Sequence, residues 1–586
     1  MPLLSEVLAL VMAAALPGPG PSDLLLQGGT VYESAQSPGR PASVLIRAGR
    51  ILFVGEPARA RELAPSAAVV SVAGGAVFPG WADAHGHLLG LGKSLETADL
   101  KGAANASEAA GRIAAIASKL PPEAWAEGRG WDQNRWPGGS YPDARDLDVI
   151  SDRPAVAHRV DGHAIWVNGA ALRKAGVGAS TPDPAGGRIL RRADGSPTGV
   201  FVDNAMELVT RAMPGSSAAD FERQIVSAAR TCARLGLTSV QDASGYGPAE
   251  VDLLRRLADR SELPLRIYAT VSPEAASLPA ALARGARIGR GSDFLTIRAI
   301  KAYADGALGS RGAALLADYS DEPGNRGLLV TPPERLAEIA VQARHAGWQL
   351  WIHAIGDRGN RVALDAFSAA KHAEPRPPAG GDRPRIEHAQ VIALDDIPRF
   401  ARDGVIASIQ PTHATSDMEW AEKRVGPDRI RGAYAWRRLL KAGARLAGGS
   451  DFPVESENPL LGFYAAITRQ DVSGKPPGGW RPEERLSRAE ALALFTSDAA
   501  FAAFEEDRRG KIAPGFEADL TVFASDPVRA PAGEIPSMRA LLTVVGGRIV
   551  HGPDSVRSAA SGPETRALPA EGAVPAGGAV PAGAGR

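Results

Sequence analysis

The chain has 586 residues, of which 44% are apolar and 23% are charged, as is typical of a globular protein with one large core and accessory domains. Lys plus Arg and Asp plus Glu number 66 each, so the formal net charge is zero. This balance gives no indication of nucleic acid or an anionic membrane as partner, because phosphate binding needs a basic surface. The single cysteine, Cys232, excludes an intrachain disulfide framework and a cysteine-rich metal cluster.

The N-terminal residues 1–21 are expected to form a signal peptide or a disordered leader. Residues 7–16 are an apolar run of signal-peptide length, but Ser5 and Glu6 stand where a signal peptide carries basic residues. The run is too short to cross a bilayer as a helix, and no longer apolar stretch follows. We therefore expect no integral membrane segment, and both a cytoplasmic and an exported protein stay open.

Four kinds of segment make up the rest of the chain. Residues 22–78 and 508–555 both read as short strands separated by turns, and we expect the two ends to pair into one small β-sandwich domain. Residues 89–235 mix helical stretches with Gly- and Pro-rich loops and are predicted to be an insertion. The tail, residues 558–586, repeats small residues and is predicted to be disordered because it cannot bury enough apolar surface.

Residues 79–507 are predicted to form the barrel domain, in which apolar strands alternate with helix-like segments from Gly236 onward. A regular alternation of this kind predicts a parallel sheet, and eight strands suggest a closed (β/α)8 barrel of the TIM type. An open doubly wound sheet is the alternative. The predicted strands are residues 78–87, 237–243, 265–271, 295–304, 349–355, 384–391, 405–411 and 445–449.

Metal-ligand residue types fall at the ends of these predicted strands. His85 and His87 are separated by one residue, so on an extended strand their side chains point the same way. Five of the ten histidines in the chain occur at such positions. Since catalytic groups of a (β/α) barrel lie at the C-terminal ends of its strands, we expect these side chains to converge. The candidates are His85, His87, Lys301, His353, His388, His413 and Asp451.

The motifs around these residues carry a resemblance to a known family. They are PGWADAHGH, KAYADGALGSRGA, WIHAIGD, RIEHAQ, QPTHATSD and GGSDFPVE, followed by GKIAPGFEADLTVF near the C-terminus. In order and spacing the chain resembles the amidohydrolase superfamily, and within it the amidohydrolase-3, YtcJ-like branch. The similarity covers roughly residues 22–555.

The resemblance implies a site for two divalent metal ions, usually zinc. His85 and His87 would bind the first metal, and His353 and His388 the second. Lys301 would be carboxylated by carbon dioxide and bridge both, since an ammonium group beside two cations would be repelled. An ion pair with Asp305 is the alternative for Lys301, and the site would then hold one metal. Asp451 would bind metal and act as the catalytic proton shuttle for a bridging hydroxide.

Five further residues are candidates for substrate binding. Asp305 and Arg311 follow Lys301 in a Gly-rich loop, where they either grip substrate or brace the loop. His413 follows the seventh strand. His163 and Trp131 lie in the insertion and would line a lid over the barrel mouth, with packing inside the insertion as the alternative.

The predicted function is hydrolysis of a non-peptide carbon–nitrogen bond in a small molecule such as an amide or formamide. Carbamates and cyclic ureides are further substrates to consider. A mononuclear deaminase or an esterase on the same scaffold is the alternative within enzymes. A catalytically inactive small-molecule-binding regulator is the alternative from another class. Analogy with the family also suggests a homodimer.

Overall fold

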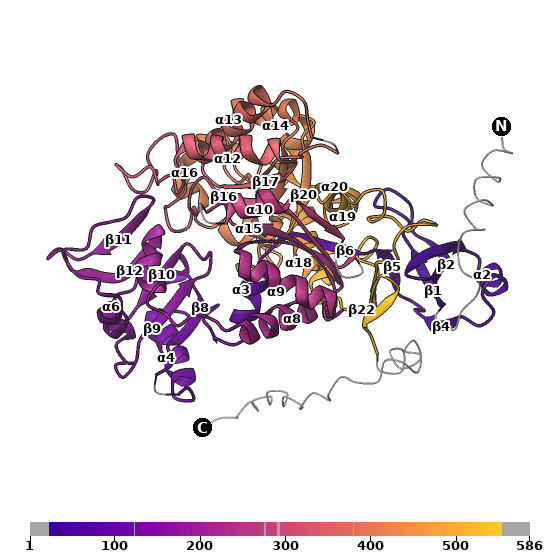
Figure 1. The fold of residues 1–586 in the computed structure, drawn as a ribbon, viewed down its shortest axis with the longest axis horizontal. Coiled ribbons are helices and arrows are strands. Elements are labelled where there is room, and N and C mark those ends of the chain that lie inside the picture. Colours follow the sequence, from indigo (N-terminus) through magenta and orange to yellow (C-terminus); the bar gives the residue numbers. More distant parts are fainter. Residues whose placement is uncertain (1–22, 122, 275–276, 290–292, 379, 554–586) are drawn as a thin grey trace.

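The computed structural model describes residues 23–553 except for residues 122, 275–276, 290–292 and 379. The predicted leader and tail lie outside the described residues. Three sheets organise the described chain, and Figure 1 shows them side by side. The barrel lies in the centre, the insertion lies on one side of it, and the sheet built from the chain ends lies on the other.

Eight parallel strands form the nearly closed barrel that the sequence predicts. Their hydrogen-bonded path runs from β6 to β20, and helices on the outside connect them. The strands are β6 (Trp81–Gly86), β13 (Leu237–Tyr246), β14 (Arg266–Val271), β16 (Leu295–Tyr303), β17 (Gln349–Ala354), β18 (Arg385–His388), β19 (Ile406–Ile409) and β20 (Arg445–Gly448), and the short β15 (Arg287–Gly289) pairs with β16. The connecting helices are α8 (Ala218–Arg234), α9 (Pro248–Asp259), α10 (Leu278–Arg284), α12 (Pro333–His345), α13 (Asp357–Ala373), α14 (Ile397–Asp403), α15 (Pro411–Asp417), α16 (Ala421–Arg429) and α17 (Trp436–Lys441).

Side chains and loop backbone complete the barrel between its first and last strands. Ser450, two residues after β20, donates its hydroxyl to Asp83 of β6 at 2.6 Å. The amide of Asp451 donates to the carbonyl of His85 at 2.7 Å. Burial raises the pKa of Asp83 to about 6, against hydrogen bonds from Ser450 and His85 that lower it. The closing contacts therefore lie directly beneath the candidate site.

The predicted first strand, residues 78–87, consists of two strands in different sheets. β5 (Ala76–Pro79) pairs with the chain-end strands, whereas β6 belongs to the barrel. Gly80 separates them, and a Cβ there would lie 2.3 Å from the hydroxyl of Thr238. The chain thus crosses between domains at a point too crowded for any residue but glycine.

The two chain ends meet in one mixed sheet of eight strands. Strand β21 pairs antiparallel with β5, which joins the C-terminal strands to the N-terminal ones. All eight strands are hydrogen-bonded into a single sheet, whereas a sandwich consists of two packed sheets. The sandwich arrangement therefore stays a prediction. The strands are β1 (Leu24–Val31), β2 (Arg40–Arg47), β3 (Arg50–Gly55), β4 (Ala68–Ser71), β5, β21 (Leu520–Phe523), β22 (Ala540–Val545) and β23 (Arg548–His551), with α2 (Pro57–Leu63) beside them.

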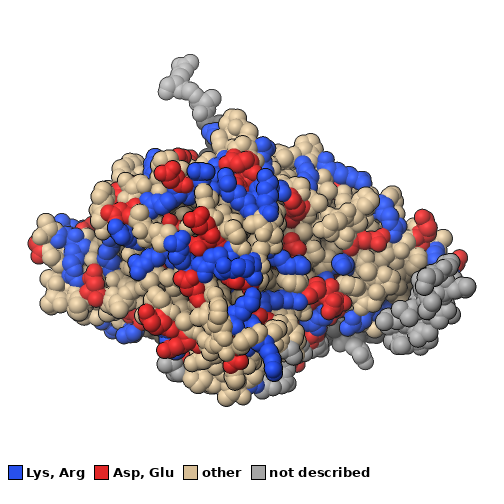
Figure 2. All heavy atoms as spheres, turned by 90° about the horizontal axis from the view of Figure 1, so that it is seen from above, with Lys and Arg blue, Asp and Glu red and all other residues tan. Residues whose placement is uncertain are grey.

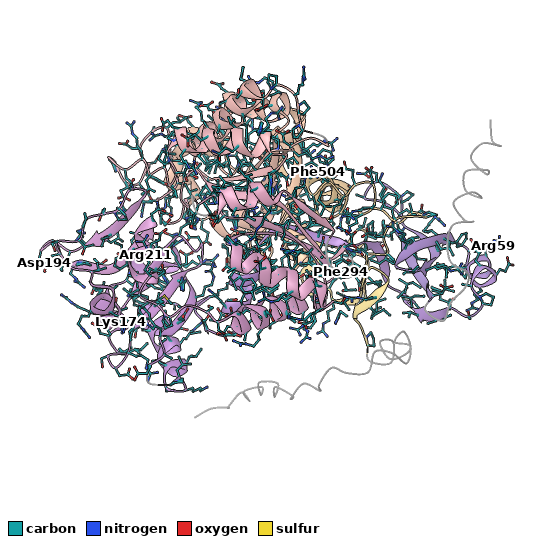
Figure 3. The ribbon with its side chains drawn as sticks, viewed as in Figure 1. Arg59, Lys174, Asp194, Arg211, Phe294 and Phe504 are labelled. Atoms are coloured by element: carbon teal, nitrogen blue, oxygen red, sulfur yellow. The ribbon has the colours of Figure 1, made fainter. Side chains whose placement is uncertain are left out.

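Arg–aromatic stacking joins this sheet to the barrel. Phe294, labelled in Figure 3 at this junction, receives the guanidinium of Arg266 from the barrel and that of Arg548 from the sheet. The distances to the ring centroid are 4.8 and 4.6 Å. Helices α18 (Pro459–Thr468), α19 (Arg488–Leu494) and α20 (Ser497–Ala502) complete the chain between β20 and β21.

The insertion contains a six-stranded sheet that the sequence pattern does not reveal. Apolar side chains pack on both of its faces, which explains why the strands lack a clean polar–apolar alternation. Its strands are β7 (Ala98–Asp99), β8 (Ala126–Trp131), β9 (Ala155–Arg159), β10 (Ala164–Val167), β11 (Gly187–Arg191) and β12 (Pro197–Asp203). Its helices are α3 (Leu88–Ser94), which leads into it from β6, α4 (Ala106–Ala117), α5 (Ala144–Leu147), α6 (Gly169–Ala175) and α7 (Glu207–Thr210).

Charges of both signs are spread over the surface seen in Figure 2, as the balanced composition leads one to expect. None of the helices in the described part of the chain has the length and apolar character needed to cross a membrane.

Candidate metal centre

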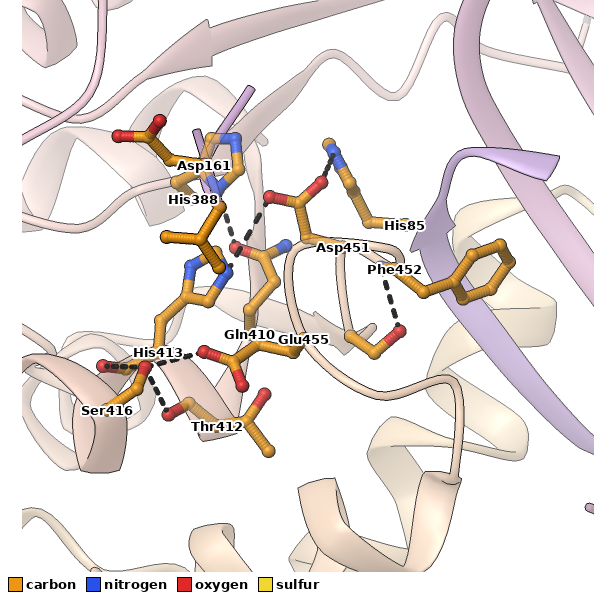
Figure 4. A network of polar contacts seen from close by, with 12 residues as sticks. His85, Asp161, His388, Gln410, Thr412, His413, Ser416, Asp451, Phe452 and Glu455 are labelled. Atoms are coloured by element: carbon orange, nitrogen blue, oxygen red, sulfur yellow. Dashed lines mark hydrogen bonds and ion pairs between the residues drawn. The ribbon is translucent and has the colours of Figure 1, made fainter. Parts of the chain in front are cut away.

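Three of the predicted ligands come together at the C-terminal mouth of the barrel. One ligand atom each from His85, His388 and Asp451 lies within 4.8 Å of the other two, and all three residues are buried. Figure 4 shows Asp451 between His85 on one side and His413 on the other. Nε2 of His85 is buried, makes no hydrogen bond to the described residues and lies 3.4 Å from Oδ1 of Asp451. An unpartnered buried nitrogen facing a carboxylate fits a cation between them.

The other predicted ligands surround this cluster. Nε2 of His87 lies 2.9 Å from Oδ1 of Asp451. The ring of His353 lies 4.5 Å from that of His388, measured between centroids. Lys301 is buried and lines the same pocket as His87 and His353. It forms no ion pair with any carboxylate in the described part of the chain, so the expected alternative of a Lys301–Asp305 pair is not present.

Two of these residues have strained backbone conformations that orient their side chains. His388 has φ of 73° and Asp451 has φ of 61°, both in the left-handed region that non-glycine residues rarely adopt. Neighbouring residues of a regular strand point to opposite faces. The turn at His388 allows both His388 and the preceding Glu387 to face the site. The alternating pattern of a regular strand does not predict this arrangement.

Each of three histidines has one ring nitrogen held by an oxygen of the protein. Nδ1 of His85 contacts the carboxylate of Glu387, and Nδ1 of His388 lies 2.8 Å from Oε1 of Gln410. Nε2 of His353 lies 3.4 Å from the carbonyl oxygen of Gly306. Such contacts fix the ring and the tautomer, and they leave the second nitrogen for a metal.

Glu387 and Gln410 are functional candidates that sequence reasoning missed. Glu387 is wholly buried, and Arg385 on the same strand binds both of its carboxylate oxygens, at 2.8 and 3.0 Å. Burial opposes ionisation, but Arg385 and His85 hold the pKa of Glu387 below its usual range. The motif RIEH does contain a carboxylate beside the predicted ligand His388, and that signal could have identified Glu387.

The protonation states of His353, His388, Asp451 and Lys301 suit metal binding. Burial lowers the pKa of His85, but the carboxylates of Glu387 and Asp451 raise it and prevail. Burial lowers the pKa of His353 and His388 well below the ordinary value, so both rings are neutral. Burial raises and the neighbouring His85 and His87 lower the pKa of Asp451, and the histidines prevail, so it is ionised. Burial also lowers the pKa of Lys301 to about 8. Neutral imidazoles, a carboxylate and a lysine with an accessible neutral form are donors that a divalent cation site requires.

Two pockets of about 530 and 510 Å³ open above the cluster and share His163, His353, His388 and Asp451 on their walls. His413 also lines the first pocket, and its Nε2 lies 3.6 Å from Oδ2 of Asp451. His163 reaches the pockets from the loop between β9 and β10. These volumes suit a small-molecule ligand.

Three of the substrate-binding candidates do not face these pockets. Trp131 is fully buried in the core of the insertion, and its indole N–H donates to the carbonyl of Ala157 at 2.8 Å. The expectation of a substrate contact is therefore corrected: Trp131 supports the pocket wall from behind, 5.9 Å beneath the guanidinium of Arg159.

Asp305 and Arg311 also have supporting positions. The carboxylate of Asp305 accepts three backbone N–H groups, from Ala314, Ile355 and Gly356, at 2.8 to 2.9 Å. Arg311 is held by Asp321 at 3.0 Å and by Glu322 at 3.1 Å. Both residues thus brace the loop after β16, because their polar groups are already paired.

A hydrolytic metal-dependent barrel enzyme is the class of protein that this fold and site define. The chain belongs to the amidohydrolase family, whose model matches residues 68–551. YtcJ of Bacillus subtilis (strain 168) is 33% identical over 531 residues, which cover 89% of this chain and 98% of YtcJ. An N-substituted formamide deformylase of Arthrobacter pascens is 27% identical over 522 residues, covering 86% of this chain and 94% of that enzyme.

A solved structure supports the same assignment. It is that of an uncharacterized metal-dependent hydrolase from Pyrococcus horikoshii OT3, which superposes with a TM-score of 0.70 at 29% identity. The match covers 87% of this chain and 99% of that one. Together with the family match, this makes the protein a metal-dependent hydrolase that acts on carbon–nitrogen bonds.

Proposed function

We propose that this protein hydrolyses a small amide, with N-substituted formamides as the first substrate class to consider. The observation that carries the proposal is the buried group of His85, His388 and Asp451 beneath a pocket of small-molecule size. The similarity to a formamide deformylase over nearly the full length supports this choice of substrate. Carbamates and cyclic ureides present the same carbonyl–nitrogen unit and come next.

The ligands fit two divalent cations, and we propose zinc. His85 and His87 would hold one ion through nitrogens that face Asp451, and His353 and His388 would hold the other. Lys301, as a carbamate, would supply an anionic oxygen to both. Its depressed pKa supports this, because carbon dioxide reacts with the neutral amine, and at a pKa of about 8 roughly a tenth of the lysine is neutral at pH 7.

The residues around the scissile bond have separate roles in proton transfer and substrate binding. A divalent cation held by these residues would lower the pKa of water and polarise a carbonyl oxygen. The Asp451 carboxylate takes the proton of the attacking water and then delivers it to the leaving nitrogen. His413, 3.6 Å from Oδ2 of Asp451, is placed to contact the substrate beside that oxygen.

Metal content separates this proposal from the alternatives. About two zinc ions per chain support the binuclear amidohydrolase, and one supports a mononuclear deaminase or esterase on the same scaffold. Absence of bound metal would favour an inactive small-molecule-binding regulator. The homodimer suggested by the family stays a prediction that sedimentation analysis can test.

The decisive experiment measures products from a panel of N-formyl, N-acyl and carbamoyl compounds. Zinc-loaded protein is expected to release formate and free amine from at least one formamide. A chelator such as dipicolinate should abolish this turnover, and added zinc should restore it. Release of ammonia or alcohol from matched amino-heterocycles or esters, without amide cleavage, would overturn the proposal.

A further inference from the structure

The insertion delivers a histidine–aspartate pair to the barrel site. Nδ1 of His163 lies 2.6 Å from Oδ1 of Asp203, at the end of β12. The backbone N–H of Asp203 donates to the carbonyl of His163 at 3.0 Å. The two residues are thus linked through both side chain and backbone, although they are distant in sequence.

The pair is built into the junction between the insertion and the barrel. Asp203 is buried and has φ of 51°, a strained conformation for a residue with a side chain. Its carboxylate packs against Gly306 and Gly312 of the loop that follows β16. A Cβ on either glycine would lie 2.4 Å from Oδ2 of Asp203. The barrel loop therefore carries glycines where the insertion places this carboxylate.

The other nitrogen of His163 is free for a ligand. The His163 ring lies 4.9 Å from the ring of His353, centroid to centroid, and lines both pockets. No described residue makes a hydrogen bond to its Nε2. Burial lowers and Asp203 raises the pKa of His163, and Asp203 prevails. In the neutral form of the ring, Asp203 accepts the proton held on Nδ1, so Nε2 presents a lone pair and acts as an acceptor.

We propose that His163, oriented by Asp203, accepts a hydrogen bond from the N–H of the scissile amide and makes the enzyme selective for N-monosubstituted amides. This inference rests on the proposed amide hydrolysis. An N,N-disubstituted amide has no N–H to offer, so its binding would leave Nε2 of His163 without a partner in the pocket. Sites built around a substrate N–H reject the analogue that lacks it, because their buried polar group loses its partner.

The test compares formanilide with N-methylformanilide, which differ by one methyl group on nitrogen. The measured quantity is the ratio of kcat/KM for the two compounds in zinc-loaded wild type and in His163→Leu. Comparing ratios between enzymes cancels the intrinsic reactivities of the two amides. We expect the ratio to fall at least tenfold in His163→Leu, chiefly through loss of activity on formanilide.

Matched variants identify the cause of any change. His163→Gln places an amide oxygen near the same position and should retain part of the selectivity. Asp203→Ala should lose selectivity because the ring is no longer oriented. His345→Leu, at an exposed histidine of α12 on the barrel exterior, is the control and should leave the ratio unchanged. An unchanged ratio in His163→Leu would overturn the inference, and so would loss of bound zinc, which would make His163 a ligand.

A binding measurement separates failure of this inference from failure of the proposed function. Calorimetry with both compounds is run on wild type and His163→Leu whether or not turnover occurs. Selective binding of formanilide without turnover would retain the inference and overturn the proposed reaction. Equal binding of both compounds by wild type would overturn the inference even if formamides are hydrolysed.

Discussion

Nε2 of His87 lies 2.9 Å from Oδ1 of Asp451, although the two residues follow the first and last strands of the barrel. The backbone of Asp451 also donates to His85, and Ser450 binds Asp83 directly beneath. The gap between β6 and β20 is therefore closed by the same residues that form the candidate metal centre. Occupation of that centre by a cation would stabilise the barrel at its weakest point of strand pairing.

Asp451→Asn should lower kcat by about 10²–10⁴-fold, because it removes the proposed proton carrier and keeps the side-chain shape. Binding of formanilide, measured by calorimetry, should change little. Asp396→Asn, at a buried carboxylate paired with Arg361 outside the site, is the control and should keep its activity. Near-normal turnover by Asp451→Asn would contradict the mechanism.

Lys301→Ala should lose activity that added acetate or propionate, together with zinc, partly restores. A short carboxylate would replace the anionic oxygens of the proposed carbamate. Lys101→Ala removes an exposed lysine that lines the first pocket, and acetate should not affect that variant. Wild-type protein supplied with ¹³C-bicarbonate should also show a carbamate signal by NMR. Absence of both rescue and signal would exclude the carbamate and leave hydrolysis itself untouched.

Glu387→Gln should weaken zinc binding about 10- to 100-fold, because Glu387 orients His85 through Nδ1. Competition with a chelator of known affinity measures this without reference to activity. Ser408→Ala is the matched control, since Ser408 binds the same guanidinium of Arg385 at 2.9 Å but does not contact His85. An equal loss of affinity in both variants would assign the effect to Arg385 instead.

Asp417 should make the stability of the protein fall as the pH rises from about 4 to about 7. Burial raises its pKa from 3.8 to about 7, and Tyr434 donates to it at 2.6 Å. Between those values the folded state binds a proton that the unfolded state has released, so the free energy of unfolding decreases with pH. The slope contributed by this group is at most about 1.36 kcal/mol per pH unit.

Asp417→Asn tests this prediction because it removes the titration and keeps an acceptor for Tyr434. The difference in melting temperature between Asp417→Asn and the wild type should increase in favour of the variant from pH 4 to pH 7. Above pH 7 this difference should stay constant. Parallel melting curves for both proteins over that range would show that Asp417 does not titrate there.

The local sequence pattern was sufficient to predict the eight barrel strands and to place candidate ligands at their ends. Apolar runs separated by helix-like segments gave eight strands, and the structure has strands at each predicted place. His85, His353 and His388 lie at strand ends because a strand and its terminal residue are neighbours in the chain. A (β/α) barrel then brings all such ends to one face, whatever the loops between them do.

Tertiary packing decided the rest. The sequence pattern did not predict the sheet of the insertion, because both of its faces are apolar. Three predicted substrate-binding residues are paired or packed away from the pockets, namely Trp131, Asp305 and Arg311. The meeting of His163 with Asp203, and of Glu387 with His85, depends on strained turns and on how separate elements pack. Residue type and periodicity indicate which chemical groups a chain can place at its strand ends. Which of these groups contact one another depends on packing between segments that are far apart in sequence.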